Sequence, residues 1–167
     1  MPTPARLVNE SLTDETPHGP SQHVIITGLG RADAAARVMD AKRGHLAWQI
    51  TSLEGRTDGI RTAGDFWLRA LQALDEDAAR PFAELGHERR EAYALEALRR
   101  MTANLLMVHV PDFDRVLQGL QSERHGWALR KALSGYYCLV LVGTAADRRF
   151  MTEYDEPFYG YFYEVRA

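Results

Sequence analysis

YYCLVLVG, residues 136–143, is a continuous apolar run that stops at a glycine. Its β-branched and aromatic residues predict a strand. Both faces of such a strand would be apolar, and strands of this kind lie in the middle of a sheet whose two faces are covered. We therefore expect residues 136–143 to form the central strand of the domain.

Further strands are expected near both ends of the chain, and helices between them. The expected strands are HVIITG (23–28), HLAWQITSL (45–53), FMTEY (150–154) and PFYGYFYEV (157–165). The expected helices cover 30–44, 62–74, 84–107, 112–120 and 126–135. The run LLMVHV (105–110) is ambiguous, because it could end a helix or begin a strand.

This order of elements predicts an α+β fold, with a mixed or antiparallel sheet built from the N-terminal and C-terminal strands and packed against a helical middle. Residues 23–53 could instead form a β-α-β unit. Residues 1–22 contain four prolines and few large apolar groups. We expect them to form a flexible N-terminal arm, which leaves residues 23–167 as a single domain.

Composition narrows the classes of function. The 167 residues carry a net charge of −3, which argues against a dedicated nucleic-acid binder. Cys138 is the single cysteine, so no internal disulfide can form and a cytoplasmic protein is expected. Arginine outnumbers lysine eighteen to two, which is typical of a GC-rich bacterial or phage genome.

Six of the sixteen aromatic residues lie in EYDEPFYGYFYEV, residues 153–165. In a strand, Tyr159, Tyr161 and Tyr163 would share one face. They could complete the core, stack on nucleic-acid bases, or contact a protein partner. The neighbouring acids, among them Asp155 and Glu156, would repel phosphate and favour a core or a protein partner with a basic face.

The stretch TGLGR (27–31) lies between a predicted strand and a predicted helix, as a phosphate-binding loop does. The dinucleotide-binding pattern requires a third glycine or alanine three places after Gly30, where this chain has Asp33. It also lacks the Gly-Lys-Ser/Thr of a P-loop. We therefore interpret these glycines as turn residues and expect no cofactor and no metal.

Two further groups of residues could carry a function. His109, Asp112 and Asp114 lie close together in the sequence and could form an acid-base pocket. Arg124, Arg130, Lys131, Arg148 and Arg149 could form a basic patch for nucleic acid or an acidic protein.

The sequence thus favours a non-catalytic protein that binds another protein, as an inhibitor, adaptor or small subunit of a bacterial or phage assembly, through its aromatic and acidic C-terminal surface. A small enzyme using His109 and a nucleic-acid-associated protein using the basic patch remain alternatives. Self-association into a homo-oligomer is also open, and no contact with a membrane is expected.

Overall fold

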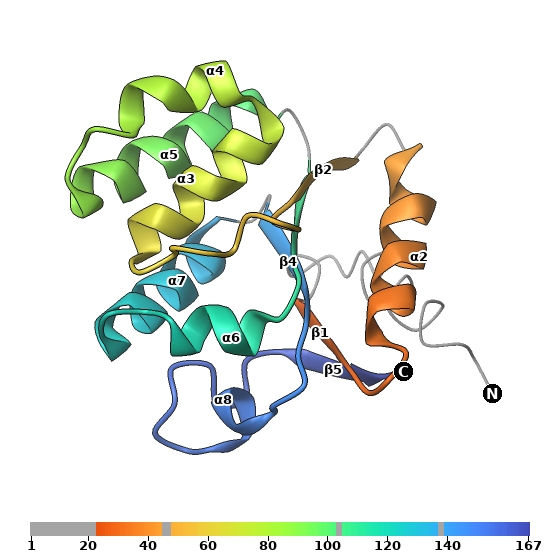
Figure 1. Ribbon diagram of the computed structural model, residues 1–167. Helices are drawn as coiled ribbons and strands as arrows, with labels where there is room; N and C mark the ends of the chain where they lie inside the picture. Colours follow the sequence, from red (N-terminus) through yellow and green to blue (C-terminus); the bar gives the residue numbers. More distant parts are fainter. Residues whose placement is uncertain (1–22, 45–47, 103–104, 137–138) are drawn as a thin grey trace.

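The computed structural model describes residues 23–44, 48–102, 105–136 and 139–167 (Figure 1). The proposed N-terminal arm and Cys138 lie outside the described residues. In chain order the elements are β1 (Val24–Thr27), α2 (Arg31–Arg43), β2 (Trp48–Ser52), α3 (Ala63–Leu74), α4 (Glu76–Ala79), η1 (Arg80–Phe82), α5 (His87–Met101), β3 (Leu105–Val110), α6 (Phe113–Gln118), α7 (Glu123–Gly135), β4 (Leu139–Thr144), α8 (Arg149–Thr152) and β5 (Tyr163–Arg166).

The strands form one five-stranded sheet in the order β2-β3-β4-β1-β5, and every pair in it is parallel. Strand β4 is central, and all six of its residues are buried, which confirms the expected central apolar strand. The expected mixed or antiparallel sheet is wrong. Parallel neighbours require crossovers over the sheet faces, and the helices between the strands supply them, so the fold is α/β.

Residues 105–110 and the C-terminal tail differ most from expectation. Residues 105–110 form strand β3, which pairs with β4. The predicted α+β fold did not include a strand at this position. The tail forms a strand over Tyr163–Arg166 alone. Gly160, with φ +62°, lies in the turns before it, and the predicted strand at 150–154 is instead helix α8 followed by a turn.

Helices cover both faces of the sheet (Figure 1). Helix α2 packs on one face, where Val38 and Met39 contact Ile26, Val140 and Val142. Helices α3, α5, α6 and α7 pack on the opposite face in a larger core that contains Phe66, Trp67, Leu98, Phe113 and Leu129. Because β3 and β4 are buried on both sides, their continuous apolar sequences follow from this three-layer arrangement.

Helices α3 and α5 pack closely at Gly64. A side chain there would overlap the main-chain carbonyl of His87, so the contact requires a glycine. The start of α3 is fixed by a capping box in which Thr62 and Asp65 exchange hydrogen bonds. Asp65 also pairs with Arg90 of α5, which ties the same helix end to its neighbour.

His23 joins β4, α7 and the C-terminal segment. Its Nδ1 accepts a hydrogen bond from the Leu141 N–H at 3.0 Å, so the proton lies on Nε2, which donates to the Leu133 carbonyl at 3.2 Å. The ring also stacks on Tyr161, with the ring centroids 5.5 Å apart. Burial lowers the pKa of His23 from 6.5 to about 4, so the imidazole is held neutral.

Replacing Gly64 with alanine should destabilise the α3–α5 contact. We expect Gly64→Ala to lower the free energy of unfolding by about 2 kcal/mol in urea titrations, because a methyl group must displace backbone. Gly135→Ala is the matched control, since open space surrounds Gly135 at the end of α7. A Gly64→Ala protein as stable as the control would contradict the described packing.

His23 should make stability depend on pH. Its folded pKa lies below its unfolded value, so its contribution is complete above pH 6.5 and is lost as pH falls toward about 4. The loss attributable to this one group is about 3 kcal/mol. Unfolding titrations of His23→Gln should show a shallower pH dependence in this window. An NMR pKa near 6.5 for the His23 ring would disprove the assignment.

Candidate functional site

In parallel α/β sheets ligands bind outside the carboxyl ends of the strands, where the strand order reverses. Here β1 lies between β4 and β5, and the turn Gly28–Leu29–Gly30 connects it to α2. Gly28 has φ +97°, which favours glycine. The side chain of Leu29 is fully exposed. This short turn is the place in the fold where a bound phosphate would be expected.

The backbone of Ala167 occupies the space over this turn. Its N–H donates to the Thr27 carbonyl at 2.7 Å, and a side chain on Gly28 would overlap its carbonyl oxygen. The Arg31 guanidinium turns back and donates to the Gly28 carbonyl at 3.0 Å. The Thr27 and Gly28 carbonyls are therefore bonded within the protein, while Gly28, Leu29 and Gly30 themselves are exposed.

The structure separates the members of the expected acid-base pocket. His109 is in β3 on the face covered by α2, and its Nδ1 is 2.8 Å from the Ser52 Oγ. Asp112 has φ +49°, and its N–H donates to the Thr144 Oγ1 at 3.0 Å. Asp114 lies in the first turn of α6, in the other layer, and its carboxylate accepts a hydrogen bond from the Asp147 N–H. Burial lowers the pKa of His109, which keeps its imidazole neutral.

The tail tyrosines do not form a ladder. Tyr163 is in β5, whereas Tyr159 and Tyr161 lie in the preceding turns. Tyr161 packs between His23 and the Arg130 guanidinium, and its hydroxyl is 3.1 Å from the Ser134 Oγ. Phe158 is fully buried against Phe113. Tyr159 and Tyr163 are partly exposed, Asp155 is exposed, and Glu156 is half-buried.

Most of the expected basic patch is engaged within the protein. Arg148 forms a two-point ion pair with Glu164, at 2.5 and 2.6 Å, and Arg149 pairs with Asp147 at 2.6 Å. Arg130 donates to the Pro157 carbonyl at 2.6 Å. Exposed Arg124 lies 3.7 Å from Glu88, and Lys131 is exposed on α7.

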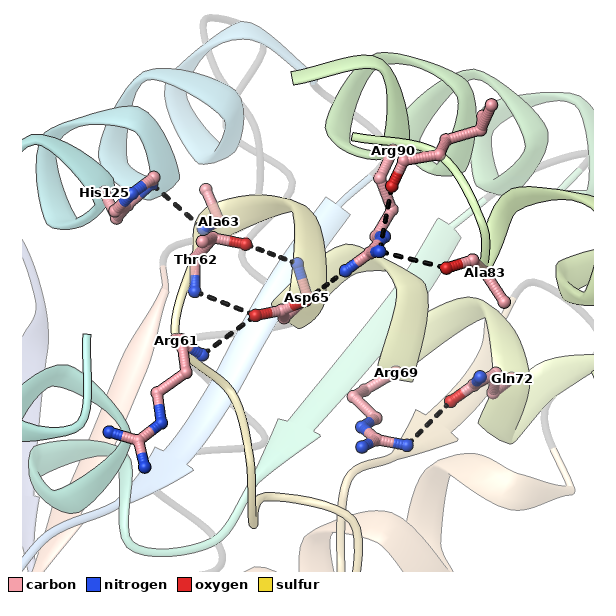
Figure 2. Close-up of polar contacts among 10 residues, drawn as sticks. Arg61, Thr62, Ala63, Asp65, Arg69, Gln72, Ala83, Arg90 and His125 are labelled. Carbon is pink, nitrogen blue, oxygen red and sulfur yellow. Dashed lines mark hydrogen bonds and ion pairs between the residues drawn. The ribbon is translucent and has the colours of Figure 1, made fainter. Parts of the chain in front are cut away.

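A different set of arginines surrounds the loop from Leu53 to Thr62. Within the described residues none of the four forms an ion pair with a carboxylate, and we call them the loop arginines: Arg56, Arg61, Arg69 and Arg115. Figure 2 shows Arg61 and Arg69 extending away from the Asp65–Arg90 pair. Arg115 belongs to α6, whose end lies against this loop, with Gly119 close to the Ile60 carbonyl.

The loop arginines were not singled out from the sequence, and spacing alone distinguishes only Arg56, because the other three each have an aspartate three or four residues earlier. Helical arginines such as Arg43, Arg80 and Arg100 each have a carboxylate three or four residues earlier and pair with it. Arg56 and Arg61 lie in a loop, where that spacing does not bring a carboxylate to them. The loop itself holds two arginines, Arg56 and Arg61, and two acids, Glu54 and Asp58, and Arg69 and Arg115 add two cations from α3 and α6.

Solved structures share this fold at low sequence identity. The chain is similar to Aeropyrum pernix Orc1 in complex with DNA (TM-score 0.66, 15% identity, 98% of this chain and 44% of that chain). It is similar to Cdc6p from Pyrobaculum aerophilum, with a TM-score of 0.62 and 13% identity over 96% of this chain and 41% of that chain. It is also similar to the Walker-type ATPase PABY2304 of Pyrococcus abyssi, with a TM-score of 0.58 and 14% identity over 98% of this chain and 51% of that chain. It spans about half or less of their length. No protein-family model and no curated protein matches the sequence.

These similarities support the α/β fold with its parallel sheet. They contradict the expectation of a non-catalytic protein-binding module such as an inhibitor or adaptor. That expectation relied on the lack of a recognisable site and on a surface strand of tyrosines, and the fold contains no such strand within its described residues. The solved structures that share the fold include one in complex with DNA and one named as a Walker-type ATPase.

The residues of this chain do not fit the nucleotide that the fold family implies. A P-loop places four residues between its glycine and a Gly-Lys-Ser/Thr at the start of the helix, and its lysine contacts phosphate. Here three residues separate β1 from α2, no lysine stands at the start of α2, and Asp33 lies in the first helical turn.

The described residues contain neither a membrane-spanning helix nor a cluster of metal ligands. No helix in this part of the chain is long and apolar enough to cross a membrane. No three histidine, cysteine, aspartate or glutamate side chains in the described ranges lie together as metal ligands would.

Mg-ATP should not stabilise this protein. A nucleotide with a Kd of about 10 μM, present at about 1 mM, would add about 2.7 kcal/mol to the free energy of unfolding. We expect thermal unfolding curves with and without Mg-ATP to coincide, because no lysine stands at the start of α2 and Asp33 lies in its first turn. A rise in Tm of several degrees with Mg-ATP would show that the chain does hold a nucleotide.

Proposed function

We propose that this chain is a DNA-associated domain that contacts the phosphate backbone through the loop arginines and does so without a bound nucleotide. The observation that carries the proposal is the set of four arginines around one loop without carboxylate partners among the described residues. The shared fold with Orc1 in complex with DNA supports it at the level of architecture.

The charge distribution supports this location over the basic patch considered from the sequence. An arginine already paired with a carboxylate must give up that pair before it can neutralise a phosphate. Arg148 and Arg149 are paired in this way, whereas Arg56 and Arg61 have no such pair within the described residues. A guanidinium matches phosphate oxygens with two parallel hydrogen bonds, so arginines of this kind at a protein surface suit this ligand.

The proposed contact is with the backbone of DNA and does not read its sequence. Phosphate contacts position a protein on a duplex, while sequence is read at base edges in the grooves. The chain's overall charge of −3 restricts the attraction to this local surface, so binding should be weak and strongly dependent on salt.

Removing three of the loop arginines should weaken DNA binding. In fluorescence anisotropy with a duplex of about 20 base pairs at low salt, we expect Arg56→Gln/Arg61→Gln/Arg115→Gln to raise Kd at least about tenfold. The slope of log K against log salt should fall by about 0.9 for each phosphate that the variant no longer neutralises. Arg69 is left in place because it is half-buried and bonded to Gln72.

The matched control is Arg37→Gln/Arg43→Gln/Arg80→Gln, which removes the same charge from exposed positions on α2 and at the end of α4. We expect its affinity for DNA to stay within about twofold of the unaltered protein. Equal weakening in both triple variants would mean that net charge alone governs binding, and the proposal would be wrong. Binding that ignores salt would also exclude it.

A further inference from the structure

A cleft of about 490 Å³ lies between the α6–α7 layer and the segment from Asp147 to Pro157. Leu117, Leu120 and Gly126 line one wall. Pro157 lies against Gly126 and closes one end, and Arg130 fixes this proline by donating to its carbonyl at 2.6 Å. The volume is in the range of small-ligand sites in proteins.

The cleft is strongly acidic. One arginine and six acids line it, and the acids are Asp114, Glu123, Asp147, Glu153, Asp155 and Glu156. Arg149 is engaged by Asp147, with bonds of 2.9 and 2.6 Å to the same carboxylate oxygen. The other five carboxylates have no ion pair within the described part of the chain. Burial and the neighbouring charges of Asp155, Glu153 and Glu123 raise the pKa of Glu156.

Asp114 supplies an independent sign of an unmet interaction. Asp114 is part of the cleft wall, and only 5% of its surface is exposed. Oδ2 accepts a hydrogen bond from the Asp147 N–H at 2.9 Å, whereas buried Oδ1 has no partner among the described residues. A buried carboxylate oxygen without a donor is costly, and a ligand that brings N–H groups would satisfy it.

Aromatic residues lie in and near the cleft. Phe150 is part of its lining. Outside the lining, Trp127 follows Gly126 on α7, is about half exposed, and its Nε1 donates to the Glu123 Oε1 at 3.4 Å. Planar cations bind well where carboxylates and aromatic faces are combined.

We propose that this cleft binds a guanidinium group, with Asp114, Glu123 and Glu156 as its carboxylate partners. A metal ion is the weaker fit, because the acids of the described residues do not converge as a metal-ligand set. Guanidinium has planar N–H groups that pair with carboxylates at two points and stack on aromatic rings. The group could belong to free arginine or to an arginine side chain of a peptide, and the two share this chemistry.

The test is isothermal titration calorimetry of the full chain with three probes. Free arginine and a Gly-Arg-Gly peptide carry the guanidinium, and citrulline has the same shape without the charge. We expect at least one arginine probe to bind and citrulline to bind at least about tenfold more weakly. Peptide binding without arginine binding would identify a peptide as the source. Binding of neither arginine probe, or equal binding of citrulline, would overturn the proposal.

Variants locate the binding in this cleft. Asp114→Asn/Glu156→Gln should weaken binding of the arginine probe at least about tenfold, and Glu123→Gln/Glu156→Gln should do the same while leaving buried Asp114 intact. Glu76→Gln/Asp77→Asn removes the same charge from exposed positions on α4 and should leave binding unchanged. Unchanged binding in Glu123→Gln/Glu156→Gln, or equal weakening in the α4 control, would place the cation elsewhere and refute the site.

Discussion

The burial of strand β4 on both faces is the constraint on which the rest of the structure depends. All six of its residues are buried, so helices must cover both sides of the sheet and strands must pair with both of its edges. Parallel strands β3 and β1 fill those two positions, and their connections pass over the faces as helices. Helix α2 covers one face and the α3–α7 layer covers the other.

This arrangement also decides where function can reside. The carboxyl edge of the sheet is the usual ligand site of such folds, but here the exposed β1–α2 turn has its Thr27 and Gly28 carbonyls bonded to Ala167 and Arg31 and is followed by Asp33 in the first turn of α2. Two groups of charged residues without ion pairs within the described residues lie instead on the α6–α7 side. The loop arginines are on one side of the α6–α7 connection, which Gln121 joins to Arg61 through a 2.8 Å backbone bond. The acidic cleft is on the other, and its opposite charge would keep DNA phosphates away from it.

The sequence predicted individual elements better than their assembly. The apolar run of β4, the helix near 31–43 and the strand near 48–52 were all expected close to their observed bounds. Strand direction was not, because a strand's own residues do not encode whether its neighbours run parallel, and the role of 105–110 was ambiguous by length alone. The C-terminal tail was predicted to be a strand because aromatic residues are common in strands. In the structure Gly160 has a positive φ, the residues around it form turns, and Phe158 is buried.

The functional residues were harder to predict because they depend on pairing across the fold. Arg148 and Glu164 lie sixteen positions apart and meet only in the folded chain, so the sequence could not show that this arginine is engaged. Likewise, Asp114 and Glu156 come to one cleft from separate segments. Asp112, close in sequence to Asp114, does not line that cleft, and its backbone N–H is instead bonded to Thr144.

Hydrogen–deuterium exchange of the full chain with and without duplex DNA tests the proposed DNA contact most directly, because it maps the bound surface without altering any residue. We expect DNA to slow exchange in the loop 53–62 and in α6, and to leave exchange in the β1–α2 turn and in residues 147–157 unchanged. Protection centred on the β1–α2 turn, or no protection at a DNA concentration that saturates binding, would contradict a contact through the loop arginines.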